Sequence, residues 1–117
     1  RLARKRANVV VIDVDAGRLE EFRRKFRTVQ TIEGDATNEL NLAKANIVEA
    51  KHVVAAMESE LDNLLIGITC KDMGDGISVI ARSNNPAIAN RMRKAGIDEV
   101  ISPNQLGGER ATELILA

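Results

Sequence analysis

Short runs of aliphatic residues alternate along the chain with longer segments in which apolar residues recur every three or four positions. The first run, Val9 to Val14, has no polar residue before Asp13, which is typical of a strand buried on both faces of a parallel sheet. The runs predict strands near 8–14, 29–32, 52–56, 77–81 and 99–101, and the periodic segments predict helices near 16–26, 38–45, 59–73, 86–95 and from 105 onward. Repeated strand-then-helix order predicts an α/β fold whose parallel sheet has right-handed crossovers.

Within the predicted helices, the apolar spacing indicates which residues face the core. Cys70, the only cysteine, cannot form an internal disulfide and is expected to be a small buried hydrophobe. Asp15 and one of Asn84 and Asn85 are expected to cap helices, and Gly74 to end one. The expected inward-facing residues are Leu19, Phe22 and Phe26, then Leu61, Leu64, Leu65 and Ile68, and finally Ile88, Met92 and Ala95.

The start of the chain, Arg1 to Arg4, is typical of a helical turn. A complete dinucleotide site has a glycine-rich turn between its first strand and first helix, and none precedes Val9 here. We therefore expect residues 1–117 to form a single α/β domain that is incomplete at its amino end, without its own first strand and phosphate loop.

Composition excludes several classes of protein. Seventeen basic and seventeen acidic residues cancel, so no overall field favours nucleic acid or an anionic membrane. The absence of Trp and Tyr also argues against stacking on exposed bases. No apolar stretch approaches the roughly 20 residues that cross a bilayer, so we expect a cytoplasmic domain without direct membrane insertion.

Acidic residues follow two of the predicted strands. Asp13 stands where the first buried strand ends, and there it could accept hydrogen bonds from a ribose diol or merely cap the following turn. Asp35 follows Gly34 at the end of the next strand, where it could meet an adenine edge or form an ordinary Gly-Asp turn. Two acids at neighbouring strand ends suggest the adenosine half of a nucleotide site.

Other polar residues give weaker indications. Glu58, Glu60 and Asp62 crowd the start of a helix, where the helix dipole already favours acids, and their spacing does not support a metal site. Arg82 ends the fourth strand and could contact a phosphate or a partner's acid, or be an ordinary structural arginine. His52 lies at the opposite end of its strand and is expected to be structural. We find no catalytic triad and no metal-ligand spacing.

Five segments together carry a family resemblance: NVVVIDVD, IEGDAT, AKHVVAAMESELDNL, ISVIAR and AGIDEVISPNQLGGERA. Over nearly the whole chain they resemble the RCK domain, the regulator of potassium conductance, also known as the Trk-type NAD-binding or TrkA-N domain. The most specific part is VIAR, followed by an Asn-Pro helix and AGIDEVISP.

The resemblance implies a Rossmann-like domain at the inner face of the cell membrane, attached to a potassium channel pore or to a potassium-uptake subunit. The ending ISPNQLGGERAT is more similar to the channel-linked members. The implied ligand is NAD(H) or an adenine nucleotide (ATP, ADP or AMP), whose binding changes the geometry of a homodimer, or of a larger gating ring. By position, the cofactor-binding residues would be Asp13 and Val14 at the ribose, Asp35 and Ala36 at the adenine, Met57 and Glu58 near ribose or phosphate, and Arg82 at a phosphate or a dimer contact.

Two further features qualify the resemblance. A calcium-gated archaeal channel of the family has acids at the positions of Met57, Arg82 and Asn84, and none of the three is acidic here, so that calcium site should be absent. The last helix is apolar enough to cross to a partner, although packing on its own sheet is the alternative. Its apolar residues are Leu106, Ala111, Leu114 and Ile115.

The favoured function is therefore a non-catalytic, nucleotide-sensing module that gates potassium transport. One alternative is a fragment of an NAD-dependent oxidoreductase, which would need a substrate domain and a proton-relay residue that the chain does not show. Another is an assembly domain whose nucleotide site has decayed. A shared fold does not separate these readings, because function resides in sites.

Overall fold

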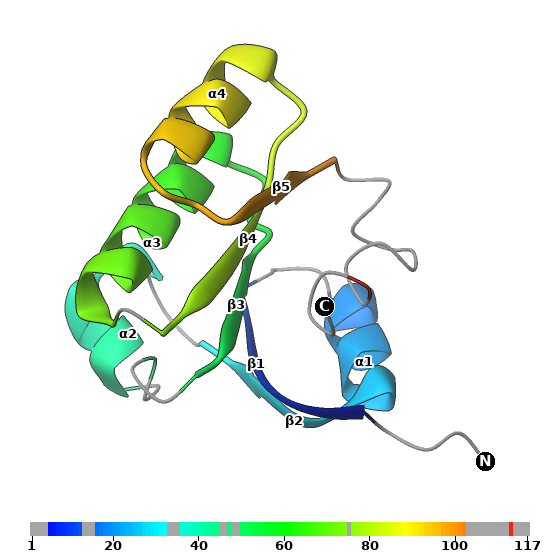
Figure 1. The fold of residues 1–117 in the computed structure, drawn as a ribbon. Coiled ribbons are helices and arrows are strands. Elements are labelled where there is room, and N and C mark those ends of the chain that lie inside the picture. The colour runs from blue at the N-terminus through cyan, green and yellow to red at the C-terminus, as the bar shows by residue number, and fades with distance from the viewer. Residues whose placement is uncertain are drawn as a thin grey trace.

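The computed structural model describes residues 5–12, 16–32, 36–44, 47, 50–74, 76–102 and 113. In them, five parallel strands form a sheet in the order β2-β1-β3-β4-β5, with helices on both faces (Figure 1). The strands are β1 (Lys5–Ile12), β2 (Phe26–Thr31), β3 (His52–Ala55), β4 (Ser78–Arg82) and β5 (Glu99–Ile101). The helices are α1 (Ala16–Lys25), α2 (Glu39–Lys44), α3 (Glu60–Met73) and α4 (Pro86–Lys94). The predicted parallel α/β fold is thus confirmed.

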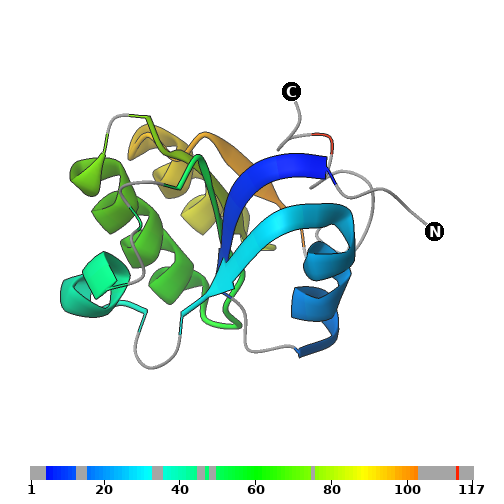
Figure 2. The ribbon, with the colours of Figure 1, turned by 90° about the horizontal axis from the view of Figure 1, so that it is seen from below.

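The strand order reverses direction at β1. From β1 the chain moves outward to β2, and it then returns to the other side of β1 to build β3, β4 and β5. Helix α1 accordingly covers one face of the sheet, whereas α2, α3 and α4 cover the other (Figure 2). The helices that follow β1 and β3, namely α1 and α3, therefore lie on opposite faces, and such a switch point is where doubly wound sheets bind ligands.

Strands β1 and β3 pair directly and end at the same level. Their register runs from Val9 opposite His52 to Ile12 opposite Ala55. One further bond, from the Ala56 amide to the Ile12 carbonyl at 2.8 Å, continues the pairing past the end of β3. Both strands thus end side by side at the carboxyl edge.

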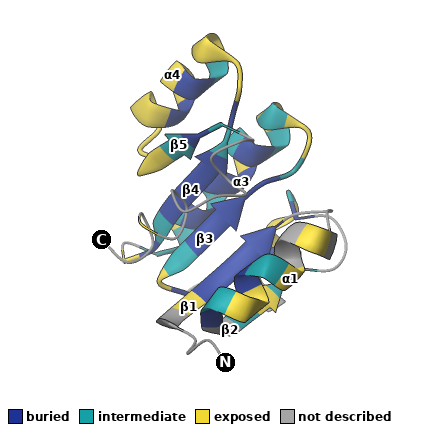
Figure 3. Cartoon of the chain, turned by 90° about the vertical axis from the view of Figure 1, so that its right-hand side faces the viewer, coloured by how far each residue is buried: buried dark blue, intermediate teal, exposed yellow. Residues whose placement is uncertain are grey.

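Both faces of the central strands are buried, as their unbroken aliphatic runs predicted (Figure 3). Alternate side chains of β1 point to opposite faces. Val10 and Ile12 join the apolar cluster under α2, α3 and α4, while Val9 and Val11 pack with Phe22 on the α1 side.

The junction between α1 and β2 differs from the prediction. We expected a helix to 26 and a strand from 29, but α1 ends at Lys25 and β2 begins at the very next residue. Phe26 is 1% exposed and its ring lies 6.2 Å from that of Phe22, so it contributes to the core as a strand residue. The first strand also begins earlier than expected, at Lys5. The expected opening turn at 1–4, Leu19's side chain, the Asp15 cap and the helix from 105 lie outside the described residues, apart from the helical Glu113.

The predicted buried stripe of α3 was largely wrong. Leu61 is 64% exposed, and Leu65 and Ile68 are also exposed. Only Leu64 packs partly against the core, and Cys70 is buried as expected. The residues that face the sheet are Asn63, Ile66, Gly67 and Cys70. The prediction failed because apolar residues occupy more than one face of this helix, so their spacing does not identify the inner one.

The ends of α3 and α4 agree better with the sequence. Asn85 caps α4, its Oδ1 accepting from the Ala87 and Ile88 amides at 2.9 and 3.2 Å, and α3 ends at Gly74. Ala95, expected to face inward, is an exposed C-cap, because α4 ends at Lys94 and buries Ala89 and Met92 instead.

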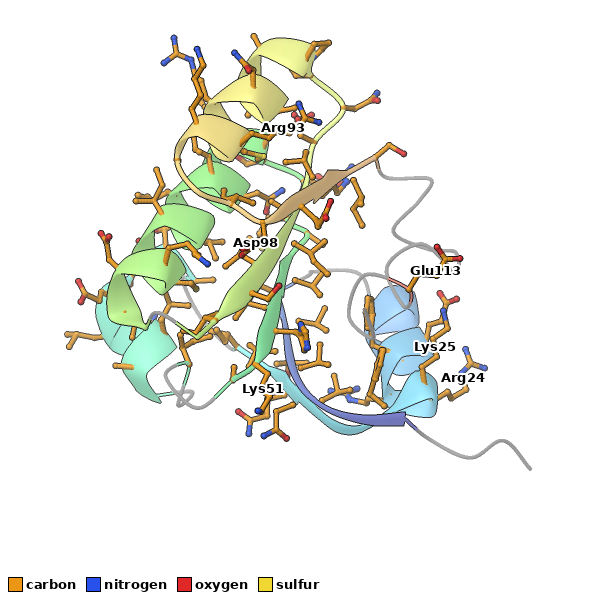
Figure 4. The ribbon with its side chains drawn as sticks, in the orientation of Figure 1. Arg24, Lys25, Lys51, Arg93, Asp98 and Glu113 are labelled. Atoms are coloured by element: carbon orange, nitrogen blue, oxygen red, sulfur yellow. The ribbon has the colours of Figure 1, made fainter. Side chains whose placement is uncertain are left out.

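The turn after α4 is held to the sheet by Asp98. Its carboxylate accepts from the Val79 amide at 2.7 Å and from Lys71 Nζ at 3.0 Å, and it points from the turn towards β4 and α3 (Figure 4). One side chain thereby joins β4, α3 and the start of β5.

Candidate functional site

The candidate site lies at the carboxyl edge of the sheet, where the reversal of strand order predicts it. Of the residues proposed from the sequence, Asp13, Val14 and Asp35 lie outside the described residues. Ala36 is 2% exposed and belongs to the apolar core. Met57, Glu58 and Arg82 are all described, and all lie just beyond or at the ends of β3 and β4.

Asn63, from the first turns of α3, ties these two strand ends together. Its side chain is completely buried. Its Oδ1 accepts from the Met57 amide at 2.8 Å, while its Nδ2 donates to the Met57 carbonyl at 2.9 Å and to the Arg82 carbonyl at 3.1 Å. A single buried amide therefore holds the backbone at the ends of both β3 and β4. The oxygen and the nitrogen of this amide both have hydrogen-bond partners.

Arg82, the last residue of β4, reaches back over the end of β3. Its Nη1 donates to the Met57 carbonyl at 2.8 Å. Its Nε is buried and has no hydrogen-bond partner among the described residues. A guanidinium presents five donors, and a buried donor that lacks an acceptor is costly. Because the bond to Met57 uses only Nη1, other donors of the guanidinium could pair with an anionic oxygen, such as one of a phosphate.

Glu60, the first residue of α3, holds the loop that follows β4. Its carboxylate accepts from the Ser83 hydroxyl, from the Asn84 amide at 3.1 Å and from the Asn85 amide at 3.2 Å. The Ser83 bond chiefly lowers the pKa of Glu60, and the two amides and the charge of Arg82 lower it further, against the effect of burial. Glu60 is therefore ionised at neutral pH and acts as a hydrogen-bond acceptor, not as a proton donor.

The remaining residues of the edge are more open. Glu58 is exposed, and Met57 is half-buried against the core. The structure thus brings Met57, Glu58 and Arg82 to one edge. Asn63, Ser83 and the partners of Glu60 were missed by sequence reasoning. For Asn63 a signal existed, because it is an amide directly before the run 64–68, which has no polar side chain.

Other reactive groups lie elsewhere. His52 is at the amino end of β3, opposite the candidate site. Burial raises the pKa of the Cys70 thiol to about 11, so it is protonated and unreactive at neutral pH. Within the described ranges, no three His, Cys, Asp or Glu side chains gather as a metal site would require. In the same residues, no helix is both long and apolar enough to span a membrane.

Comparisons with known proteins place this geometry in a family. Residues 1–103 match the family model of the TrkA-N domain. The chain is 33% identical over 106 residues to potassium channel protein 1 of Methanocaldococcus jannaschii, and 30% identical over 106 residues to probable potassium channel protein 2 of the same organism. These alignments include 89% and 90% of this chain but 32% and 31% of those proteins, so the chain spans about a third of the length of these relatives.

Solved structures share the fold. The GsuK RCK domain superposes with a TM-score of 0.71 at 20% identity, covering 93% of this chain and 28% of that one. GsuK bound to ADP gives 0.66 at 18% identity, with 84% and 31% covered. The GsuK channel bound to NAD gives 0.61 at 16% identity, with 83% and 21% covered. Since the family model matches most of the chain, the chain belongs to the TrkA-N domain family.

Proposed function

We propose that this chain is a nucleotide-sensing regulatory domain of a potassium transport system and is not an enzyme. The observation that carries the proposal is the position of Arg82, whose partly buried guanidinium lies at the switch-point edge and uses Nη1 for the Met57 carbonyl. Two relatives are named as potassium channel proteins, which supports the transport context. The domain would work in the cytoplasm, at the inner face of the membrane, beside a channel pore or an uptake subunit.

NAD(H) or an adenine nucleotide is the proposed ligand. GsuK, which shares the fold, has been solved with NAD and with ADP. In this proposal Asp13 and Val14 hold the ribose, and Arg82 binds a phosphate. The remaining contacts would come from Asp35 and the Ala36 backbone at the adenine, and from Met57 and Glu58 near the ribose or phosphate.

Regulation would follow from a difference in affinity. If the nucleotide binds one arrangement of a homodimer, or of a larger ring, more tightly than another, its binding shifts the balance between them and hence the gate. No chemical step on the ligand is needed, so binding without turnover is expected.

An exposed apolar stripe on α3 supports self-association. Leu61, Leu65 and Ile68 recur at i, i+4 and i+7 and are 64%, 47% and 36% exposed. Exposed apolar side chains aligned on one helix are typical of protein interfaces.

We expect the double substitution Leu61→Ser and Leu65→Ser to lower the molar mass of the assembly measured by light scattering after size-exclusion chromatography. Leu40→Ser, at a 70% exposed leucine of α2, is the matched control and should leave the mass unchanged. An unchanged mass in the double variant would remove the stripe from the interface.

The nucleotide proposal is tested by calorimetric and thermal-shift titration of the intact protein with NAD, NADH, ATP, ADP and AMP. Saturable stabilisation by at least one of them is expected. Asp13→Ala should weaken that binding by about 1 to 3 kcal/mol, the range for losing hydrogen bonds to a charged group. Asp72→Ala, at an exposed acid in the last turn of α3, should bind as the unaltered protein does. A lack of response to all five nucleotides would favour an assembly domain instead.

A further inference from the structure

We propose that Glu60 is a positioning residue, which holds Arg82 in the orientation in which its guanidinium receives a nucleotide phosphate. The inference rests on the proposed nucleotide function and assigns Glu60 a role in it. Glu60 would not touch the ligand. It would act through the backbone that carries Arg82.

The first step of the argument is that Glu60 fixes the residue after Arg82. Ser83 is 6% exposed, and its amide donates to the Ile101 carbonyl of β5 at 3.0 Å. Its hydroxyl donates to the Glu60 carboxylate. The same carboxylate accepts from the next two backbone amides, so the loop 83–85 is folded around it. Ser83 is thus held by the sheet on one side and by α3 on the other.

The second step is that α3 also fixes Arg82 itself. Asn63 lies three residues after Glu60, one helical turn away, so the two side chains project from one face of α3. Asn63 Nδ2 holds the Arg82 carbonyl at 3.1 Å, while Glu60 holds Ser83. Consecutive residues of β4 and its loop are therefore anchored to consecutive turns of one helix. The Arg82 guanidinium is itself hydrogen-bonded to the Met57 carbonyl at 2.8 Å. Both the backbone and the side-chain end of Arg82 are therefore held in place.

The third step concerns charge. The Glu60 carboxylate is close enough to Arg82 for their charges to interact, yet its three hydrogen bonds go to the loop. The guanidinium donates to Met57 instead, and its Nε stays unpaired. A direct Glu60–Arg82 ion pair would compete with a phosphate for the arginine. Engagement of Glu60 by the loop leaves Arg82 available to an anionic ligand.

The test compares a ligand that has phosphates with one that lacks them. Affinities for ADP and for adenosine are measured by calorimetry on the intact protein and on Glu60→Gln, which keeps the size of the side chain but removes its charge. We expect ADP to bind roughly 5- to 50-fold more weakly to Glu60→Gln, corresponding to a loss of about one charged hydrogen bond. Adenosine binding should change less than about twofold, because only the phosphate contact depends on Arg82. Asp62→Asn, which removes a charge from the same helical turn, is the matched control and should bind ADP normally.

A merely structural role for Glu60 predicts a different pattern, in which both ligands are weakened alike. If the Glu60 carboxylate holds the Asn84 and Asn85 amides, hydrogen exchange of these amides, measured without ligand, should be faster in Glu60→Gln. Equal ADP affinity in Glu60→Gln and the unaltered protein, or equal weakening of ADP and adenosine, would overturn the positioning role. If the unaltered protein binds neither ligand, the nucleotide proposal itself is overturned, and the role of Glu60 falls with it.

Discussion

At the scale of single residues, Asn63 connects the ends of β3 and β4 in the described part of the candidate site. Its completely buried amide makes three hydrogen bonds, to both polar backbone groups of Met57 and to the carbonyl of Arg82. Leaving buried backbone groups without partners costs more than the bonds themselves contribute. The two strand ends therefore depend on one side chain.

We expect Asn63→Ala to lower the free energy of unfolding by about 2 kcal/mol, because the Met57 amide and the Arg82 carbonyl lose this partner and the Met57 carbonyl keeps only Arg82 Nη1. Urea denaturation followed by circular dichroism measures the loss. Asn90→Ala, at an exposed asparagine of α4, is the control and should change the free energy by less than about 0.5 kcal/mol. A similarly small effect for Asn63→Ala would mean that water replaces the amide at little cost.

Sequence reasoning reached this site only in part. Arg82 could be placed from the strand pattern alone, because a residue at the end of a buried parallel strand must lie at the carboxyl edge. Its partners could not be placed, since the contact of Nη1 with the Met57 carbonyl depends on the side chain reaching across to a neighbouring strand. Glu60 was explained by the helix dipole, whereas its hydrogen bonds are to a loop 23 to 25 residues away.

At the scale of elements, α3 shows why strands were easier to predict than helix faces. A strand buried on both sides needs only an unbroken apolar run, and all five predicted strands exist. Helix α3 is apolar on more than one face, so apolar spacing alone does not identify its inner face, where Asn63, Ile66, Gly67 and Cys70 are buried. Gly67 faces the sheet there, and a Cβ at this residue would lie 2.5 Å from Ile97 Cδ1 and 2.8 Å from its Cγ1. The close approach of α3 to Ile97, in the turn between α4 and β5, therefore selects glycine.

Replacement of Gly67 by alanine tests this packing. Overpacking a core typically costs about 1 to 3 kcal/mol, while removing a glycine from a helix gains about 1 kcal/mol. Because Ile97 is itself buried and cannot simply turn away, we expect a net loss of about 1 to 2 kcal/mol in the free energy of unfolding.

The contact itself can be isolated by a double-mutant cycle. Ile97→Val removes the atom nearest to the added methyl, so the loss in Gly67→Ala/Ile97→Val should be smaller than the sum of the two single losses. Gly76→Ala, where a Cβ meets nothing within 4 Å, is the control and should be close to neutral. Strict additivity in the cycle would show that Ile97 does not limit this position.

At the scale of the whole molecule, the sheet separates its two edges by role. The carboxyl edge gathers Arg82, Glu60 and Asn63, whereas the amino edge carries His52 and the exposed Lys51. The sequence indicates the alternation of strands and helices, but the strand order that creates the switch point comes from long-range pairing of β1 with β3. That pairing leaves no local signature in the chain, so a switch point could be expected only by analogy with other doubly wound folds.

The amino edge gives the molecule a pH dependence that the candidate site does not share. Burial, and to a lesser extent the neighbouring charge of Lys51, lower the pKa of His52 below its usual 6.5. His52 Nδ1 is buried without a partner among the described residues, so the ring gains no bond that would favour its charged form. The unfolded chain therefore binds a proton at this histidine more readily than the folded protein does.

Stability should consequently fall as the pH drops below about 6.5, through the window that ends at the lowered pKa of His52, with a slope of at most about 1.4 kcal/mol per pH unit. Since His52 is the only histidine in the chain, urea denaturation between about pH 7.5 and 5.5 reports on it almost alone. In His52→Gln the free energy of unfolding should stay flat across this window. A slope that persists in His52→Gln would assign the proton uptake to acidic groups, and a flat profile in the unaltered protein would mean that the folded chain accommodates the charged ring as well as water does.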